Sequence, residues 1–178
     1  MLEVSGLSIR FHRYNRRLRQ RHMDAVQNLR LSIAAGEIVA VVGSSGSGKS
    51  LLAHAILGIL PANAQVTGHI RFKGEALTPD RQKELRGREI ALIPQSVQFL
   101  DPLMRVGEQV RQSVRQGNPE ELQRKALRKY NLADLVAKWF PFQLSGGMAR
   151  KILVSTATVS EARLLIADEP TPGLDPRQ

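Results

Sequence analysis

Apolar and polar residues alternate with a period of two along the first part of the chain, a pattern typical of half-buried β-strands. Residues 2–11 and 25–33 each follow this pattern, and Ala35-Gly36 marks a turn after the second of them. The next run, residues 37–42, is almost wholly apolar. Such a run is typical of a strand covered on both faces, as in a parallel sheet. The pattern therefore predicts two amphipathic strands followed by a buried one.

After this run the period changes. Residues 49–60 have helical character, and we expect Pro61 to end that helix because proline cannot continue it. Residues 68–74 alternate again, as in an exposed hairpin strand. Residues 89–94 have the composition of another buried strand, which stops at its proline. The order of strand, helix and strand favours an α/β arrangement.

Residues 95–144 differ from the rest, because the strand pattern fades and amphipathic helical spacing replaces it. Three helical segments are expected there: 106–116, 119–130 and 132–140. Residues 145–160 then form a long helix, and residues 163–167 a buried strand. The pattern predicts a helical insert between two parts of an α/β core.

Composition excludes several classes of protein. The 178 residues are 42% hydrophobic, which is enough for a packed core and argues against disorder. The absence of cysteine excludes disulfides and thiolate metal sites. The first residues lack the pattern of a signal peptide, and no segment approaches the roughly 18 apolar residues that span a bilayer. We therefore expect any membrane role to depend on a partner.

The formal net charge is +10, and a cluster of six arginines with no acidic residue among them supplies more than half of it. The cluster comprises Arg10, Arg13, Arg16, Arg17, Arg19 and Arg21. It could bind nucleic acid or anionic lipid, or it could be a solvated hairpin or loop. The second interpretation is favoured, because Phe11 and Tyr14 are the only aromatic residues nearby. A basic patch close to a membrane-docked subunit is an intermediate possibility.

The segment Gly43-Ser44-Ser45-Gly46-Ser47-Gly48-Lys49-Ser50 has the pattern of a phosphate-binding loop. Small residues let backbone N–H groups approach phosphate oxygens, and the helix that follows adds the positive end of its dipole. Lys49 is expected to reach the β- and γ-phosphates, and the Ser50 hydroxyl to bind Mg²⁺. A flexible glycine-serine linker would not be flanked by a buried strand and an apolar helix.

Two carboxylates end the last apolar strand. Asp168 and Glu169 follow the run Leu164-Leu165-Ile166-Ala167. In a P-loop enzyme the end of such a strand holds a Mg²⁺-binding aspartate. Glu169 is then placed to orient or deprotonate the water that attacks the γ-phosphate. An acidic helix start or turn is the alternative explanation.

A third motif, Leu144-Ser145-Gly146-Gly147-Met148, opens the long helix predicted after the insert. Ser145 can cap this helix, and the two glycines leave backbone donors accessible at its N-terminus. By itself the motif is an ordinary capped helix start. Between the other two motifs it becomes a specific anion-binding candidate.

Taken in this order, the three motifs resemble the nucleotide-binding subunits of ABC transporters, and the resemblance covers essentially the whole chain. It implies an α/β P-loop NTPase (RecA-like) core with an antiparallel β subdomain and a helical insert. It also implies ATP and Mg²⁺ as cofactors. In that family two domains meet head to tail around ATP, so Leu144, Ser145, Gly146 and Gly147 would contact nucleotide held by the opposite subunit.

The resemblance implies roles for further residues. Gln95 matches the glutamine that senses Mg²⁺ and the γ-phosphate and borders the groove for the membrane subunit. Asp175, within Gly173-Leu174-Asp175, matches a loop that crosses the dimer interface. Phe11 stands where the family stacks an aromatic ring on adenine, and Tyr14 is a rival candidate. Phe11 could equally be part of the core.

Smaller segments are similar to the peptide/nickel group of importer ATPases. They are residues 57–61, Asp101-Pro102-Leu103, residues 106–109 and residues 140–143. Two features depart from the family. Arg150-Lys151 replaces the usual Gln-Arg pair, and none of the four histidines is placed as the family's switch histidine. The last core strands are also missing, so we expect this chain alone to fold poorly or to hydrolyse ATP very slowly.

The expected function is binding and hydrolysis of ATP to drive uptake of peptides, nickel or a related small solute. Permease subunits, a second ATPase subunit and, indirectly, an extracytoplasmic solute-binding protein are the implied partners. The implied location is the cytoplasmic face of the plasma (inner) membrane. The expected parts are an ATP-binding core in residues 1–94 and 148–178 and a helical signature subdomain in residues 95–147. A truncated nucleotide-binding protein and a non-transport ABC ATPase, with nucleic acid as a less favoured partner, are the alternatives.

Overall fold

The computed structural model describes residues 1–14 and 20–169. The chain forms two compact units, Met1–Glu84 and Leu85–Gln178, and each is described on its own. Asp175 and the central arginines of the basic cluster, Arg16, Arg17 and Arg19, lie outside the described residues.

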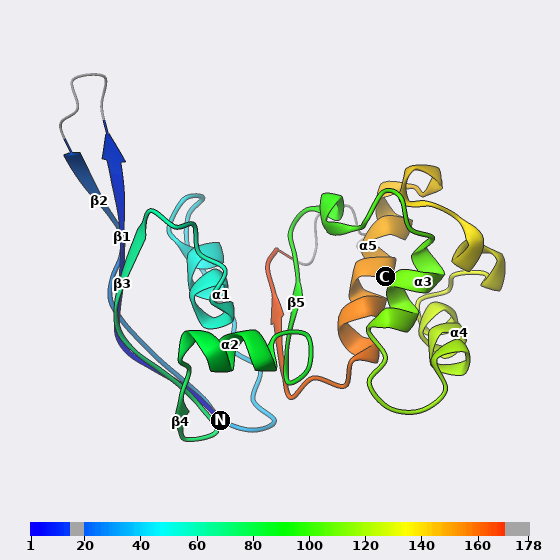
Figure 1. Cartoon of the computed structure of the whole chain (residues 1–178), viewed down its shortest axis with the longest axis horizontal. Coiled ribbons are helices and arrows are strands. Elements are labelled where there is room, and N and C mark those ends of the chain that lie inside the picture. Colours follow the sequence, from blue (N-terminus) through cyan, green and yellow to red (C-terminus); the bar gives the residue numbers. More distant parts are fainter. Residues whose placement is uncertain (15–19, 170–178) are drawn as a thin grey trace. The chain divides into compact units, whose positions relative to one another are not determined.

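The first unit is built around a four-stranded antiparallel sheet in the order β2-β1-β3-β4 (Figure 1). Its strands are β1 (Leu2–Tyr14), β2 (Gln20–Ile33), β3 (Ala64–Phe72) and β4 (Glu75–Ala76). Leu2, Leu7 and Ile9 of β1 are completely buried. The strands predicted from alternation are confirmed, and β1 and β2 are both longer than expected. They form a hairpin that continues beyond the last pair that β1 makes with β3, Phe11 with Ala64.

The structure confirms a hairpin for the described part of the arginine-rich stretch and corrects the expected strand limits, because β1 runs on to Tyr14 and β2 begins at Gln20. Cross-strand side-chain pairs support this extension. Arg10 forms an ion pair with Asp24, and the rings of His12 and His22 meet edge to face at 4.8 Å between centroids. Charge density along the sequence does not prevent strand pairing where opposite or aromatic partners lie across the hairpin.

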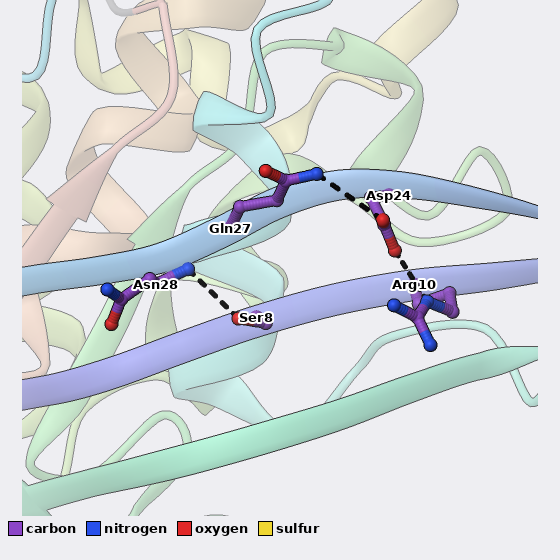
Figure 2. Close-up of polar contacts among 5 residues, drawn as sticks. All are labelled: Ser8, Arg10, Asp24, Gln27 and Asn28. Carbon is purple, nitrogen blue, oxygen red and sulfur yellow. Dashed lines mark hydrogen bonds and ion pairs between the residues drawn. The ribbon is translucent and has the colours of Figure 1, made fainter.

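Three register shifts interrupt the pairing of β1 with β2, and at two of them β2 bulges with extra residues. Register partners change from Leu7 with Leu29 to Ile9 with Val26, so two residues of β2 lie opposite Ser8 alone. The Ser8 hydroxyl accepts a hydrogen bond of 2.9 Å from the Asn28 amide (Figure 2). This bond satisfies a donor that the bulge removes from the ladder. The second bulge lies at Ala25, between the partners of Ile9 and Arg10.

Two helices complete the first unit. Helix α1 (Lys49–Leu57) is shorter than predicted, because it ends at Gly58 and not at Pro61. Gly58 has φ 65°, a left-handed conformation that favours glycine at the end of a helix. Helix α2 (Pro79–Leu85) is not predicted from the sequence pattern. The side-chain amide of its Gln82 donates to the carbonyl oxygens of Ala55 and Ile56 at 2.7 and 3.2 Å. This contact ties α2 to the last turn of α1.

The prediction of a buried strand over residues 37–42 is wrong. No strand is assigned there, and Ile38 and Val42 are 98% and 91% exposed. A strand buried on both faces requires neighbours that complete its hydrogen bonds. Within the first unit, no described strand pairs with this segment. Apolar composition alone therefore does not specify a strand here.

The second unit combines a parallel strand pair with helices. Strands β5 (Ile90–Ile93) and β6 (Leu164–Ala167) pair in parallel, and the helices are α3 (Val106–Gln112), α4 (Pro119–Lys129) and α5 (Gly146–Val159) (Figure 1). Two predicted helices are confirmed as α3 and α4. The third is a 3-10 turn over Asp134–Lys138. The long helix is confirmed as α5. Strand β6 is confirmed, but its Leu165 is 45% exposed, so it is not fully buried.

One apolar cluster holds the helices of the second unit together. Val106 and Val110 of α3, Leu127 of α4 and Ile152 of α5 are completely buried within it. Ala91, Ile93 and Ala157 form a smaller cluster between β5 and α5. Helix α5 therefore contributes to both clusters, and this fixes it beside the strand pair. No helix in the described ranges 1–14 and 20–169 is long and apolar enough to cross a membrane.

Candidate functional site

The phosphate loop predicted from the sequence lies in the first unit and leads directly into α1. Gly46 and Gly48 have φ values of 80° and 91°, in the left-handed region that side chains other than glycine rarely adopt. The Ser47 amide donates to the Ser44 carbonyl at 3.2 Å and closes a turn within the loop. The glycines are thus required by backbone conformation, which agrees with a loop whose N–H groups face a ligand.

Gly48 also approaches the sheet closely. A Cβ atom at this position would lie 2.8 Å from Val26 Cγ2 and 2.9 Å from the Ala25 carbonyl oxygen. Ala25 and Val26 belong to the second bulge of β2, where the backbone departs from regular pairing. The bulge therefore provides the surface against which the first turn of α1 packs.

The Lys49 ammonium lies over the loop. Its Nζ donates hydrogen bonds of 2.8 Å to the carbonyl oxygens of Gly43 and Ser44. Ser50 follows within the first turn of α1. A cation and the N-terminus of a helix together create a positive potential suited to a polyphosphate.

Phe11 belongs to the same unit as the phosphate loop. It pairs with Met23 of β2 and Ala64 of β3, and its side chain is half-buried. It stands two residues along β1 from Ile9, whose partner Val26 lies against Gly48. Tyr14, the rival candidate, ends β1. The role of Phe11 stays a prediction.

In the second unit the structure brings Gln95, Asp168 and Glu169 together at the carboxyl ends of β5 and β6. Register pairs Ile93 with Ala167, and the Asp168 amide donates to the Ile93 carbonyl at 2.9 Å. The Gln95 side-chain amide donates to the Glu169 carboxylate, with 2.5 Å between Nε2 and Oε2. Both side chains are exposed. Parallel pairing thus joins residues 74 positions apart in sequence.

Glu169 has an unusual backbone conformation. Its φ of 46° lies in the left-handed region, which is unfavourable for a residue with a side chain and recurs at functional sites. This strain persists only where surrounding contacts hold it. One such contact comes from Arg150 of α5, whose guanidinium donates to the Glu169 carbonyl oxygen.

Arg150 is the residue of this site that the sequence analysis missed. It is only 2% exposed, although it is a cation. It donates to the carbonyl oxygens of Pro94, Gln95, Asp168 and Glu169. The only sequence signal was the departure of Arg150-Lys151 from the family pattern, which by itself does not indicate what the guanidinium contacts.

The signature motif opens α5 as predicted. Ser145 is the N-cap residue, and its hydroxyl accepts a hydrogen bond of 3.3 Å from the Met148 amide. A Cβ atom built on Gly146 would have no atom within 4 Å, so the backbone there borders open space. Leu144 packs against the helical cluster and anchors the motif. Free amides at a helix N-terminus are suited to an anion.

The predicted Mg²⁺ ligands divide between the two units: Ser50 lies in the first, and Gln95 and Asp168 lie in the second. Their hydroxyl, amide and carboxylate oxygens are the donors that Mg²⁺ prefers. Among the residues described, no group of three or more His, Asp or Glu side chains forms a metal-binding cluster. The assignment of these three residues to Mg²⁺ stays a prediction.

The second unit also has an open cavity of about 420 Å³. Its lining includes Phe99 and Met104, which follow β5, and Leu153 of α5. Gln109 of α3 lines it as well. Its side-chain oxygen accepts a hydrogen bond of 3.0 Å from the Asp101 backbone amide, and its side-chain nitrogen donates to the carbonyl oxygens of Asp101 and Met104 at 2.9 and 2.8 Å. Phe99 remains 65% exposed at this surface.

Comparisons with known proteins agree with these motifs. A family model described as "ABC transporter" matches residues 26–172. The chain is 33% identical to the oligopeptide transport ATP-binding protein OppD of Lactococcus lactis subsp. cremoris, over 98% of this chain and 54% of that protein. It is 35% identical to the probable D,D-dipeptide transport ATP-binding protein DdpD of Escherichia coli, over 98% and 56%. The chain thus spans about half the length of these relatives.

Solved structures show the same fold. The dimeric post-hydrolysis state of the ATP-binding cassette MJ0796 bound to ADP and Pi superposes with a TM-score of 0.85, over 99% of this chain and 77% of that one. Sequence identity to it is 24%, so this likeness concerns the fold. The predicted fold class, a P-loop NTPase core with an antiparallel β subdomain and a helical insert, is confirmed.

Proposed function

This chain belongs to the ABC transporter family, and we propose that it binds and hydrolyses ATP to energise uptake of peptides, nickel or a related small solute. The observation that carries the proposal is the phosphate loop, with left-handed Gly46 and Gly48 and with Lys49 held over its carbonyl oxygens. The names of the relatives, oligopeptide and D,D-dipeptide transport ATP-binding proteins, favour a peptide as the solute.

In this proposal the first unit holds the nucleotide. Backbone amides of residues 43–48 bind the phosphates, and Lys49 exchanges its two carbonyl partners for phosphate oxygens. Phe11 supplies an aromatic face for the adenine ring. Ser50 would be the Mg²⁺ ligand of this unit, and Asp168 is a predicted ligand from the second unit; when bound, the ion would supply charge neutralisation for phosphoryl transfer.

The second unit supplies the groups for hydrolysis. Glu169 acts as the general base toward the attacking water, and Gln95 orients its carboxylate through the 2.5 Å hydrogen bond. The strained backbone of Glu169 fixes the direction in which its side chain leaves the strand end. A base held by its neighbours loses less entropy in reaching the transition state.

The proposal requires protein partners. The open N-terminus of α5 at Ser145 and Gly146 suits the γ-phosphate of ATP on a second ATPase subunit, and Asp175 would cross the same interface. The cavity beside Phe99 suits a permease subunit, which would place the chain at the cytoplasmic face of the plasma (inner) membrane. A solute-binding protein would act through the permease.

Lys49→Ala tests nucleotide binding in the intact protein. We expect affinity for a fluorescent ATP analogue to fall by about 100-fold or more, because a charge that pairs with phosphate is lost. Lys125→Ala, which changes an exposed lysine of α4, is the matched control and should leave affinity unchanged. Equal affinity in Lys49→Ala and the parent would refute the phosphate-loop assignment.

The solute is tested separately. Membrane vesicles that hold the intact protein with its permease subunits are given labelled peptides or labelled nickel, with and without internal ATP. ATP-dependent accumulation of peptide alone assigns the peptide class, and accumulation of nickel alone assigns the metal. Accumulation of neither, in vesicles that hydrolyse ATP, would overturn the importer proposal for these solutes.

A further inference from the structure

Arg150 is a buried cation for which the hydrolysis scheme above has no use. It belongs to α5, one turn beyond the signature motif, and is 2% exposed. Removing a guanidinium from water is costly unless most of its donors find acceptors. The contacts that offset this cost therefore indicate what the residue does.

Four hydrogen bonds of Arg150 to described residues divide between two segments. Nη1 donates to the carbonyl oxygens of Pro94 and Gln95, the latter at 2.9 Å. Nη2 donates to the carbonyl oxygens of Asp168, at 3.4 Å, and Glu169. One nitrogen thus serves the segment after β5, and the other serves the segment after β6. The planar fork of arginine makes such a two-sided bridge possible, whereas a lysine ammonium lacks this geometry.

The bridged carbonyls belong to the residues whose side chains meet. Gln95 and Glu169 are bonded through their side chains, and Arg150 holds the backbone of each from the other side. The bond to the Glu169 carbonyl also supports a strained backbone with a φ of 46°. Without that support we expect Glu169 to relax toward an ordinary conformation and to redirect its carboxylate.

We infer that Arg150 is a positioning residue for ATP hydrolysis: it joins the ends of β5 and β6 and thereby sets the place of Gln95 and Glu169. The inference rests on the proposed function, since it needs Glu169 to be the base. Arg150 itself touches neither substrate nor the reacting water in this scheme. It also makes α5, the helix that begins with the signature motif, a direct support of the strand ends.

Kinetics of Arg150→Met and Arg150→Lys in the intact protein test this role. We expect Arg150→Met to lower kcat for ATP hydrolysis by about 10- to 100-fold, since small misplacements of catalytic groups have effects of this size. KM for ATP should stay within about twofold, because the phosphate loop lies in the other unit. Arg150→Lys, which keeps the charge but not the fork, should lie between Arg150→Met and the parent.

Ile152→Val is the matched control for loss of stability. Ile152 is on the same helix, is completely buried and belongs to the helical cluster, not to the smaller cluster that includes Ile93 of β5. If Ile152→Val lowers both thermal stability and kcat as much as Arg150→Met does, Arg150 is merely structural and the inference is wrong. If Arg150→Met does not fold, the comparison of Arg150→Lys with Ile152→Val decides.

Amide hydrogen exchange gives a second readout that does not depend on activity. The amide of Asp168 is bonded to Ile93 beside the bridge, whereas the amide of Leu164 is bonded to Glu89 at the far end of the same strand pair. Arg150→Lys should speed exchange at Asp168 by about tenfold or more and leave Leu164 unchanged. An equal change of the exchange rate at both amides in Arg150→Lys would overturn the inference. An inactive parent would instead overturn the proposed function.

Discussion

The phosphate loop and the joined ends of β5 and β6 reach their geometry by different means. The loop is shaped by its own backbone, through Gly46 and Gly48 in left-handed conformations and a turn closed within the loop. The strand ends are shaped from outside, because Arg150 of α5 bonds carbonyl oxygens that lie 18 to 56 positions away in sequence. A site whose geometry comes from neighbouring residues can be recognised from a short sequence motif. A site whose geometry comes from residues far apart in sequence cannot.

The same difference governs how each region should respond to substitution. At Gly48 of the loop, an added methyl group would collide with Val26 and the Ala25 carbonyl oxygen. At the strand ends, the exposed side chains of Gln95 and Glu169 can be exchanged without loss of packing, so effects should be chemical. Substitutions in the two regions should therefore separate binding of nucleotide from its hydrolysis.

The largest effect is expected at the strand ends. Glu169→Gln should lower ATP hydrolysis by about 10²- to 10⁴-fold, the contribution of a general base, while binding of ATP is retained. ATP-bound dimers should then accumulate, which gel filtration with bound-nucleotide analysis would detect. Steady-state phosphate release measures the rate.

Glu161→Gln is the matched control, because Glu161 is also exposed and also has a left-handed φ, of 54°. It follows α5 and lies outside the strand ends. We expect hydrolysis at the parental rate in this variant. Hydrolysis at the parental rate in Glu169→Gln would show that another group is the base.

The next effect concerns the loop. Gly48→Ala places a Cβ atom within 3 Å of Val26 and the Ala25 carbonyl at a φ of 91°, so we expect nucleotide affinity to fall by about 100-fold. Gly46→Ala meets no atom within 4 Å and carries only the conformational strain, so its loss should be about tenfold. Titration with a fluorescent ATP analogue measures both. Equal losses of affinity would mean that backbone strain, and not the contact with β2, determines the effect of substitutions in the loop.

Sequence reasoning succeeds where structure is local. Ser145 as N-cap, Lys49 as the start of α1 and the strand over residues 2–11 are all predicted, and each depends on neighbours along the chain or on simple alternation. Predictions that needed partners from elsewhere were weaker. The apolar run 37–42 has no assigned strand, and α1 ends at the left-handed Gly58 and not at Pro61.

The candidate site shows the same limit. The phosphate loop, Asp168 and Glu169 could be found by motif, and Gln95 by resemblance. The role of Arg150 could not be found, because nothing in its sequence neighbourhood indicates that four carbonyl oxygens converge on it. Whether residues 1–94, 95–147 and 148–178 act as the predicted core and subdomain stays a prediction.

A smaller effect tests the packing of α3 against the 3-10 turn over Asp134–Lys138. Gly107 of α3 lies so close to Ala137 that an added Cβ would be 2.7 Å from its Cβ and carbonyl oxygen. Gly107→Ala should therefore lower the free energy of unfolding by about 1–3 kcal/mol, the usual effect of overpacking. Gly146→Ala, with no atom within 4 Å, should change it by no more than about 0.5 kcal/mol. Urea denaturation measures both, and similar values would contradict the tight contact.

The smallest effect concerns one exposed ion pair in each unit, Arg10 with Asp24 and Arg128 with Asp134 (Figure 2 shows the first). Hydrogen bonds from the arginines hold the pKa of each aspartate below its usual range. A carboxylate with a lowered pKa contributes stability that is full above its unfolded pKa, about 3.9, and is lost as pH falls through the folded value.

Asp24→Asn and Asp134→Asn should each reduce the acid dependence of Tm slightly and leave Tm at pH 7 almost unchanged, because exposed pairs are screened. Thermal denaturation between pH 2 and pH 7 checks this. A large loss at pH 7 from Asp24→Asn alone would mean that the long β1–β2 hairpin depends on this pair, and that the first unit, too, is fixed by contacts between distant side chains.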